Sequence, residues 1–258
     1  MKIVTQQLLF DGQRQLKRNL PFLFFSILMP AGFYILFTRV MSDTPSTPQF
    51  AKRYLTSMIV YSGLISANFG LAIMLLRDRK TGYQARLRLT PSGLGPYRIT
   101  MTTLFLLITG LTVGVLGGLA VVLNQVTLTA VQWAALVLVA GLGEVPLLLI
   151  GYGLSRLNRE ETLNLASNLL TFPGAILTGL WWPFAMLPHW AQGVGRLLPP
   201  YFTKRLLDAI VLAQPFAWQH WIGLLSWLLG LGAVGYGQRY LKKMRLTWHR
   251  SNSNGLNE

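Results

Sequence analysis

Long apolar stretches separated by short polar or charged ones dominate this sequence. A helix that crosses the roughly 30 Å hydrocarbon core of a bilayer needs about 20 mostly apolar residues. Six stretches of about this length predict an all-α polytopic membrane protein with six transmembrane helices. Their approximate ranges are 20–37, 55–76, 99–123, 131–154, 165–187 and 220–237.

The first predicted span begins at Pro21 and contains Pro30. Neither proline excludes a span, because neighbouring helices can satisfy the carbonyl groups that a proline leaves without a donor. The stretch is too long for the core of a signal peptide, so we expect it to remain as a span.

Prolines and glycines interrupt the fifth stretch, yet its apolar character persists beyond them. Backbone that leaves helical geometry inside a bilayer must be buried in protein or line a wet cavity. We therefore interpret 165–219 as a fifth span followed by short re-entrant helices in the outer leaflet. The alternative is a helix that ends near Trp182, followed by an amphipathic stretch on the outer surface. The interruptions are Pro173, Gly174, Gly179, Pro183 and Pro188.

Residues 1–19 mix apolar and basic side chains, a pattern that suits an interfacial helix on an anionic membrane surface. The alternative is a frayed terminus. The apolar members are Ile3, Val4, Leu8, Phe10 and Leu16, and the basic ones are Lys2, Arg14, Lys17 and Arg18.

Composition narrows the function classes. Of the 258 residues, 52% are hydrophobic and only 12% are charged, about half the charge of an average soluble domain. The net charge of +15 comes from Lys and Arg that punctuate apolar runs, whereas a nucleic-acid binder gathers them on one wetted face, so we expect no nucleic-acid partner. The lack of cysteine excludes thiolate metal sites and cysteine nucleophiles. Three scattered histidines do not suggest a metal centre either.

Basic residues are distributed unevenly between the two sides that six spans define. With both termini on one side, 17 of the 23 Lys and Arg residues fall on that side and 6 on the other. The cytoplasmic side carries the excess of Lys and Arg. This predicts a single multi-pass transmembrane domain (1–258) in the bacterial cell membrane, with both termini and the tail 239–258 in the cytoplasm.

The segment 77–98, between the second and third predicted spans, is the most informative cytoplasmic loop. Leu87 and Leu89 lie among charges, and 90–92 offers a helix break or restart, because Pro suits a first helical turn and Thr or Ser caps one. A short helix across the membrane face would present a rigid surface to a soluble partner. The alternative is a solvated basic loop that serves only topology.

The residue order of this loop resembles that of permease subunits of bacterial type-2 ATP-binding-cassette (ABC) exporters, with an acidic-basic-Gly pattern before Leu-x-x-Thr-Pro. The stretch 173–201 is similar to the fifth-span signature of the same family. One departure is Tyr83, where the family commonly has a small Thr. The matching loop positions are Arg77, Asp78, Arg79, Lys80, Gly82, Leu87, Thr90, Pro91 and Ser92, and those of the outer gate are Pro173, Gly179, Pro183, Pro188, Trp190, Pro200 and Tyr201.

The resemblance implies a transmembrane subunit that moves hydrophobic or amphipathic cargo, such as drugs, antimicrobials or lipids, by alternating access. It implies two kinds of partner, a cytoplasmic ABC ATPase that receives the coupling loop and a second permease half, identical or not. The chain has no Gly-x-x-x-x-Gly-Lys-Ser/Thr loop, so we expect no ATPase site, catalytic residue or cofactor in it, with ATP and Mg²⁺ bound by the partner.

Two further features remain open. Glu144 lies near the middle of the fourth span and is expensive there if charged and unpaired. We favour a hydrogen bond to Asn68 or Asn124, and the alternative is a proton or cation contact.

Glycines spaced four apart in the third span, and further glycines in the sixth, favour packing within the chain, with a dimer seam as the alternative. They are Gly110, Gly114, Gly118, Gly230, Gly232, Gly235 and Gly237.

An integral-membrane enzyme acting on lipids is the second function considered. Such an enzyme needs clustered acid, base or metal ligands. The acidic pair Glu160 and Glu161 reads equally well as the polar start of a helix, where carboxylates favour the positive end of the dipole. We therefore prefer the transporter.

Overall fold

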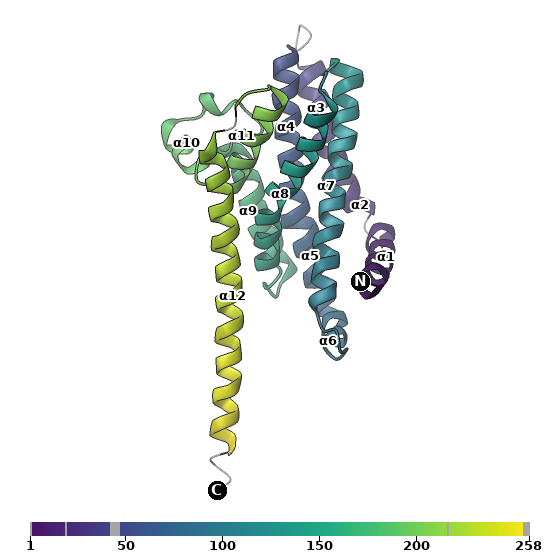
Figure 1. Cartoon of the computed structure of the whole chain (residues 1–258), viewed down its shortest axis with the longest axis vertical. Helices are drawn as coiled ribbons and strands as arrows, with labels where there is room; N and C mark the ends of the chain where they lie inside the picture. The colour runs from purple at the N-terminus through teal and green to yellow at the C-terminus, as the bar shows by residue number, and fades with distance from the viewer. Residues whose placement is uncertain (1, 19, 42–46, 216, 255–258) are drawn as a thin grey trace.

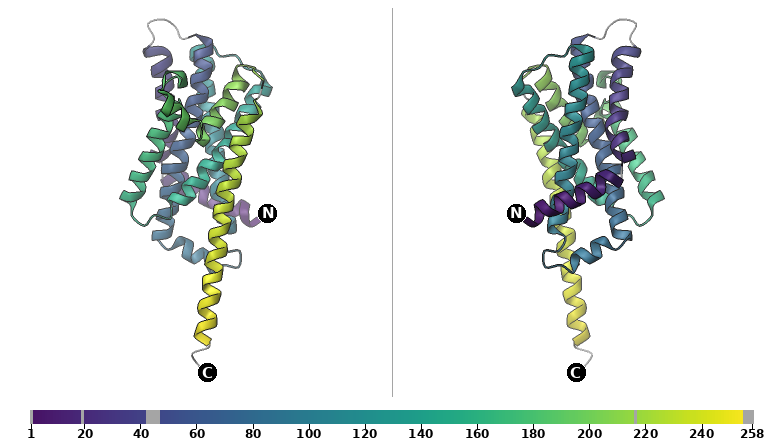
Figure 2. Two further views of the ribbon diagram at one scale, coloured as in Figure 1. Left: turned by 90° about the vertical axis from the view of Figure 1, so that its left-hand side faces the viewer. Right: turned by 90° about the vertical axis from the view of Figure 1, so that its right-hand side faces the viewer.

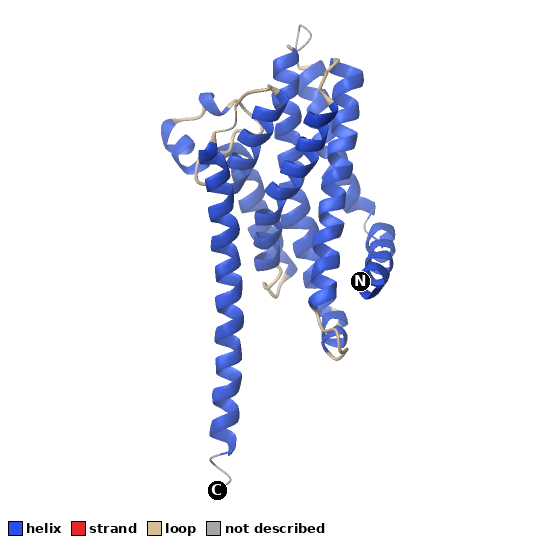
Figure 3. Ribbon diagram, in the orientation of Figure 1, coloured by secondary structure: helices blue, strands red, loops and turns tan. Residues whose placement is uncertain are grey.

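The computed structural model describes residues 2–18, 20–41, 47–215 and 217–254. Within these ranges the regular elements are all helices, most of which run along one long axis to form a bundle (Figures 1 and 3). The helices are α1 (Lys2–Arg18), α2 (Leu20–Leu23), η1 (Phe24–Leu28), α3 (Met29–Ile35), η2 (Leu36–Val40), α4 (Pro48–Ile65), η3 (Ser66–Leu71), α5 (Ala72–Lys80), α6 (Tyr83–Arg88), α7 (Gly95–Asn124), α8 (Ala130–Leu154), α9 (Glu160–Leu177), η4 (Phe184–Met186), α10 (His189–Gly195), α11 (Pro199–Val211) and α12 (Trp218–Asn254).

Three of the described helices are long and apolar enough to cross a bilayer. They are Pro48–Lys80, which joins α4, η3 and α5 without a break, together with α7 and α8. They match the second, third and fourth predicted spans. A shorter apolar helix covers Phe24–Val40, and α9 and α12 lie where the fifth and sixth spans were expected. For these remaining segments, crossing of the membrane stays a prediction.

The first predicted span is one helix that contains two π-helical segments, η1 and η2. Pro30 has no N–H to donate to the Ser26 carbonyl four residues earlier. The Ser62 hydroxyl of α4 donates to that carbonyl instead, at 2.6 Å. The expectation that a neighbouring helix satisfies a carbonyl freed by proline is therefore confirmed at Pro30.

The continuous helix α4–η3 forms the centre of the bundle. Every residue from 54 to 68 is buried, and α4 packs against α3, α7, α8 and α11. Two glycines of α8 allow close approach: a Cβ on Gly151 would collide with the Ala67 backbone, and one on Gly143 would collide with the Thr203 side chain of α11. These contacts hold α8 between the continuous helix α4–η3 and α11.

The glycine repeat of α7 does not pack within the chain, contrary to the expectation. A Cβ on Gly110, Gly114 or Gly118 would have no described heavy atom within 4 Å beyond its own helix. The same holds for Gly230, Gly232, Gly235 and Gly237 of α12. Gly117 is the packed position in α7, where the Trp133 ring fills the space of a Cβ. Larger side chains such as Phe105 and Leu116 set the buried face of α7, so the repeat falls on another face.

The two ends of the bundle carry different elements. Helix α1 lies across the outside of α7, and α1, α6 and the last turns of α12 all extend toward the same end (Figures 1 and 2). The opposite end holds α10, the end of α11 and the start of α12 (Figure 1). The residues 1–19 are helical over 2–18, while residues 1 and 19 lie outside the described part. Helix α12 continues through 239–254 of the predicted tail.

Candidate functional site

Two regions at opposite ends of the bundle contain some of the predicted site residues, and the others lie beside them or elsewhere in the bundle. The first is the basic loop, defined here as residues 81–94 between α5 and α7. It is shorter than the predicted segment 77–98, because α5 continues through Lys80 and α7 begins at Gly95. Arg77, Arg79 and Lys80 lie in the last turn of α5, where positive charge is favoured by the negative end of the helix dipole.

Gly82 ends α5 and starts α6. Its φ of 74° lies in the left-handed region, which glycine enters without the steric cost that a Cβ brings. The reversal lets α6 leave the axis of α5 at a defined angle (Figure 2). The departure at Tyr83 from the exporter pattern therefore does not prevent a helix from starting at this residue.

Helix α6 stands at the end of the bundle with no residue fully buried. Leu89, directly after it, has 88% of its surface exposed although it is apolar. The segment 90–92 breaks the helix as expected, but the restart comes at Gly95 and not at Pro91. The reason is a turn in which the Thr90 N–H donates to Leu87 O at 3.2 Å and the Gly93 N–H donates to Thr90 O at 3.0 Å.

Two hydrogen bonds and a ring contact hold α6 to three other helices, and a further hydrogen bond joins Asp78 of α5 to α7. The buried Asp78 carboxylate accepts from the Tyr97 hydroxyl of α7 at 2.7 Å. The Tyr83 hydroxyl of α6 donates to Asp11 of α1 at 3.2 Å, and the Tyr83 and Tyr97 rings meet edge to face with centroids 5.9 Å apart. The Gln84 amide donates to Leu75 O of α5 at 2.9 Å. The exposed helix is thus anchored to α1, α5 and α7.

A second set of contacts joins the end of α5 to the turn between α8 and α9. The Arg79 guanidinium donates to Leu157 O at 2.5 Å and to the Asn158 side chain at 3.3 Å. Lys80 forms an exposed ion pair with Glu160 at 3.6 Å. Glu160 therefore has a partner at the start of α9. These contacts connect the end of α5 directly to the start of α9.

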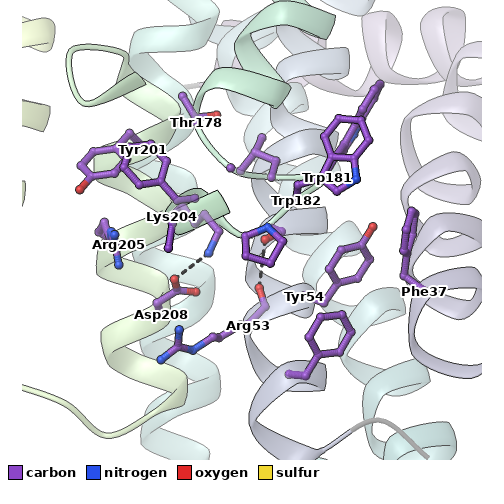
Figure 4. Close-up of a pocket in the computed structure, with 17 residues that line it drawn as sticks. Phe37, Arg53, Tyr54, Thr178, Trp181, Trp182, Tyr201, Lys204, Arg205 and Asp208 are labelled. Atoms are coloured by element: carbon purple, nitrogen blue, oxygen red, sulfur yellow. Dashed lines mark hydrogen bonds and ion pairs between the residues drawn. The ribbon is translucent and has the colours of Figure 1, made fainter. Parts of the chain in front are cut away.

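The second region is a cavity of about 440 Å³ near the opposite end of the bundle, the aromatic pocket (Figure 4). Gly179, Pro183 and Tyr201 of the predicted outer gate line it. Pro173, Pro188 and Trp190 are exposed and are not among its lining residues, and Pro200 is buried in the first turn of α11. The lining residues are Phe37, Phe50, Arg53, Tyr54, Ser57, Thr178, Gly179, Leu180, Trp181, Trp182, Pro183, Phe184, Ala185, Tyr201, Lys204, Arg205 and Asp208.

A glycine turn after α9 forms one wall of the pocket. Helix α9 ends at Leu177, and Gly179 has a φ of 72°. A Cβ on Gly179 would lie 2.8 Å from Phe184 Cβ, so the tight turn needs glycine for space as well as for conformation. The chain then returns through η4, α10 and α11, and α11 packs back against α4 and α8. This return is the geometry expected of a re-entrant segment, whose depth in a membrane remains a prediction.

Charged residues of the pocket come mainly from α11, and the sequence analysis missed their role. Lys204 pairs with Asp208 at 2.7 Å, and the Thr56 hydroxyl of α4 also donates to Asp208. The Arg205 guanidinium lies over the Tyr201 ring, 5.3 Å from its centroid. The spacing of Lys204 and Asp208, four residues apart, was a readable signal of a helical ion pair, but these cations were counted only as topology charges.

Glu144 lies elsewhere, buried in α8 with 2% of its surface exposed. Neither expected amide reaches it: Asn68 donates to Thr171 and Asn124 donates to Tyr34 and Thr38, each at 3.0 Å. Both carboxyl oxygens lack a hydrogen-bond partner among the described residues. The expected hydrogen bond is therefore not made.

Among the described residues, no group of three or more His, Asp or Glu side chains is placed to hold a metal ion. Hydrogen bonds between helices instead engage Tyr83 of the basic loop and Asp208 of the aromatic pocket.

Comparison with known proteins gives one informative result. The chain is 28% identical over 233 residues to a Bacillus subtilis protein named "Putative transport permease YvfS", covering 89% of this chain and 94% of that protein. The similarity thus includes both the basic loop and the aromatic pocket. No family model matches the chain. No solved structure matches it either.

Proposed function

We propose that this chain is the transmembrane subunit of an ATP-driven ABC exporter in the bacterial cell membrane. In this proposal the chain crosses the membrane six times with both termini in the cytoplasm. It works with a second permease half and with a separate ATPase that binds ATP and Mg²⁺. The chain itself is not an enzyme.

The exposed helix α6 is the observation that carries this proposal. Leu89 is 88% exposed directly after α6, and the contacts of α6 with α1, α5 and α7 hold this surface in a fixed position. A rigid surface that combines one apolar side chain with Arg86 and Arg88 suits a soluble protein partner. The similarity to a protein named as a transport permease supports the same conclusion.

A path for force leads from α6 into the bundle. A partner that changes shape on binding ATP would push on α6, and the Gln84, Asp78 and Tyr83 contacts would pass the movement to α5, α7 and α1. Arg79 would pass it to the turn before α9. Rigid-body motion of packed helices is a common way to convert a local event into a large rearrangement. The partner's nucleotide can shift the two states only by the difference in its affinity for them.

The cargo class follows from the surfaces available. Within the described part, the connections between helices at the end opposite α6 are short, and the aromatic pocket at that end has seven aromatic residues in its lining. Hydrophobic or amphipathic molecules fit such a lining better than a folded protein.

Co-expression with the ABC ATPase encoded nearest to this chain tests the proposal. We expect the two proteins to purify together in mild detergent, and the ATPase turnover to change in the complex. Leu89→Asp should abolish co-purification while leaving membrane insertion intact. Met41→Asp changes another apolar residue, 65% exposed at the opposite end, and should have no effect. Equal co-purification of the Leu89→Asp and unchanged chains would contradict the proposal.

A further inference from the structure

We propose that the aromatic pocket binds an anionic amphiphile, a molecule with an apolar body and one phosphate, sulfonate or carboxylate group. This inference adds a ligand class to the proposed export function, but the binding site is complete within this chain. It can therefore be tested without an ATPase.

The pocket has an apolar side and a charged side. Figure 4 shows Phe37, Tyr54 and Trp181 on one side, and Lys204, Arg205 and Asp208 on the other. The aromatic rings come from η2, α4 and the turn after α9, whereas the charged side comes from α11. A volume of about 440 Å³ is in the range of small-molecule sites, which run from roughly 300 to 1,000 Å³.

The charges on the charged side do not cancel. Asp208 is the sole carboxylate among the lining residues, and it is already paired with Lys204 at 2.7 Å, both side chains being nearly buried. Thr56 donates to the same carboxylate. Arg53 and Arg205 are left without an ion-pair partner among the side chains that the structure describes. The pocket therefore offers two guanidinium groups to an anion.

Arg205 is held in a position that suits this role. It lies over both the Phe184 and Tyr201 rings, 5.7 and 5.3 Å from their centroids. Contact with aromatic faces keeps a guanidinium in place while its N–H donors remain open to a ligand. Guanidinium groups recognise phosphate and carboxylate through pairs of hydrogen bonds. Arg53 is exposed beside the pocket, where it can approach the same anion.

An anion alone does not account for the pocket, because seven of its 17 lining residues are aromatic. Trp182 is 49% exposed and forms part of the wall together with Trp181. Aromatic surface left open next to guanidinium groups fits a ligand that carries an apolar chain or ring beside its charge. The source can be a lipid of the surrounding membrane or a soluble amphiphile, since both present the same chemistry.

Binding of dodecyl phosphate to the purified chain in phosphatidylcholine nanodiscs tests the inference. Radiolabelled ligand is used below its critical micelle concentration, with empty nanodiscs as the blank. We expect saturable binding that is at least tenfold tighter than binding of dodecyltrimethylammonium, dodecyl maltoside or inorganic phosphate. Equal binding of the cationic or uncharged chain, or of phosphate alone, would overturn the assignment.

Variants connect the binding to the pocket. Arg53→Gln/Arg205→Gln should weaken dodecyl phosphate binding at least tenfold, and Trp182→Ala should weaken it several-fold. Arg39→Gln/Arg196→Gln removes two exposed charges that do not line the pocket and should change little. The thermal unfolding temperature of each variant checks its fold. Arg53→Gln alone, at an exposed position, keeps the test valid if the double variant is unstable.

Two comparisons separate the remaining outcomes. Replacing part of the phosphatidylcholine by phosphatidylglycerol should abolish dodecyl phosphate binding if a membrane lipid occupies the pocket, and should leave it unchanged if the ligand is soluble. Unchanged affinity in the arginine double variant contradicts the inference whatever the lipid. Failure of the ATPase to bind the chain contradicts the export function but leaves a positive binding result standing.

Discussion

The Ser62 hydroxyl donates a hydrogen bond of 2.6 Å to the Ser26 carbonyl, which lies four residues before Pro30. Both serines are buried, and they come from different helices. Pro30 removes the donor that a regular α-helix would direct at Ser26. In an environment without water, that carbonyl would otherwise remain unsatisfied. One hydroxyl thus makes proline acceptable inside an apolar helix and ties this helix to the centre of the bundle.

Removal of this hydroxyl should weaken the fold only while Pro30 is present. We expect Ser62→Ala to lower the free energy of unfolding by about 1 kcal/mol, since hydrogen bonds between membrane helices contribute about 0.6 kcal/mol on average and up to about 1.7. In a Pro30→Ala background the restored N–H can serve Ser26, so Ser62→Ala should cost less. Reversible unfolding in mixed micelles measures the free energy of unfolding of the two single variants and the double variant. Ser226→Ala, which breaks a local exposed hydrogen bond, is the control. Equal losses in both backgrounds would disprove the coupling.

Gly82 provides a test of the basic loop that is limited to backbone conformation. A Cβ there has no neighbour within 4 Å, but φ is +74°, so Gly82→Ala should cost about 1 kcal/mol through strain alone. Asn tolerates this conformation better, and Gly82→Asn should be milder. Amide hydrogen exchange over 81–94 should rise in the order Gly, Asn, Ala. Gly95→Ala, at an open position with ordinary φ, should not change it. Equal exchange in the native chain and in the two Gly82 variants would show that other contacts position α6.

The length of the apolar stretches was enough to predict the long helices, because a helix that crosses a bilayer must stay apolar over about 20 residues. The match is good for α7, predicted over 99–123 and observed as Gly95–Asn124. The same signal did not predict where α5 ends. Arg77 to Lys80 read as a loop because they are charged, yet nothing before Gly82 breaks a helix, and basic residues stabilise a helix C-terminus.

Contacts between distant residues could not be predicted in the same way. The prolines and glycines of the aromatic pocket could be recognised in the sequence. The sequence did not show that Arg53 of α4 and Arg205 of α11 line the same pocket. Nor could it indicate which glycines pack, because Gly117 and Gly118 differ by one position and face different surroundings. The candidate partners of Glu144 were wrong for a similar reason, since Asn68 projects toward α9 and Asn124 toward the first span.

The Lys204–Asp208 pair should matter far more than the exposed Lys80–Glu160 pair. The first has side chains 13% and 10% exposed and a distance of 2.7 Å, and the second has side chains 47% and 51% exposed at 3.6 Å. Asp208→Asn leaves a nearly buried ammonium without its counter-charge and should cost about 3 kcal/mol. Glu160→Gln should cost less than about 1 kcal/mol. Unfolding in mixed micelles compares the two, and similar losses would refute this ranking.

Replacement of the same pair by apolar residues supplies a second check. Lys204→Met/Asp208→Leu removes both charges together, so no unpaired charge is left behind. We expect this double variant to be more stable than Asp208→Asn alone, as judged by the same unfolding measurement. A double variant that is less stable than Asp208→Asn would indicate that Thr56 and the shape of the site, and not the lone ammonium, set the cost.

Glu144 should tolerate the loss of its ionisable group. A charged and unpaired carboxylate at the middle of a span costs on the order of 2.5 to 3.5 kcal/mol on an insertion scale. Neither oxygen of Glu144 makes a hydrogen bond of ordinary geometry within the described structure, and the Ser66 hydroxyl is a neighbouring polar group. The neutral acid is therefore the expected form, and Glu144→Gln should preserve both thermal stability and the turnover of a co-purified ATPase. Glu144→Leu should also fold, because the neighbouring Ser66 hydroxyl makes no hydrogen bond of ordinary geometry that the change would remove. Turnover measured at pH 6 and pH 8 distinguishes a packing role from a proton-binding role. A changed pH profile in both variants at unchanged stability and expression would assign Glu144 to proton or cation binding.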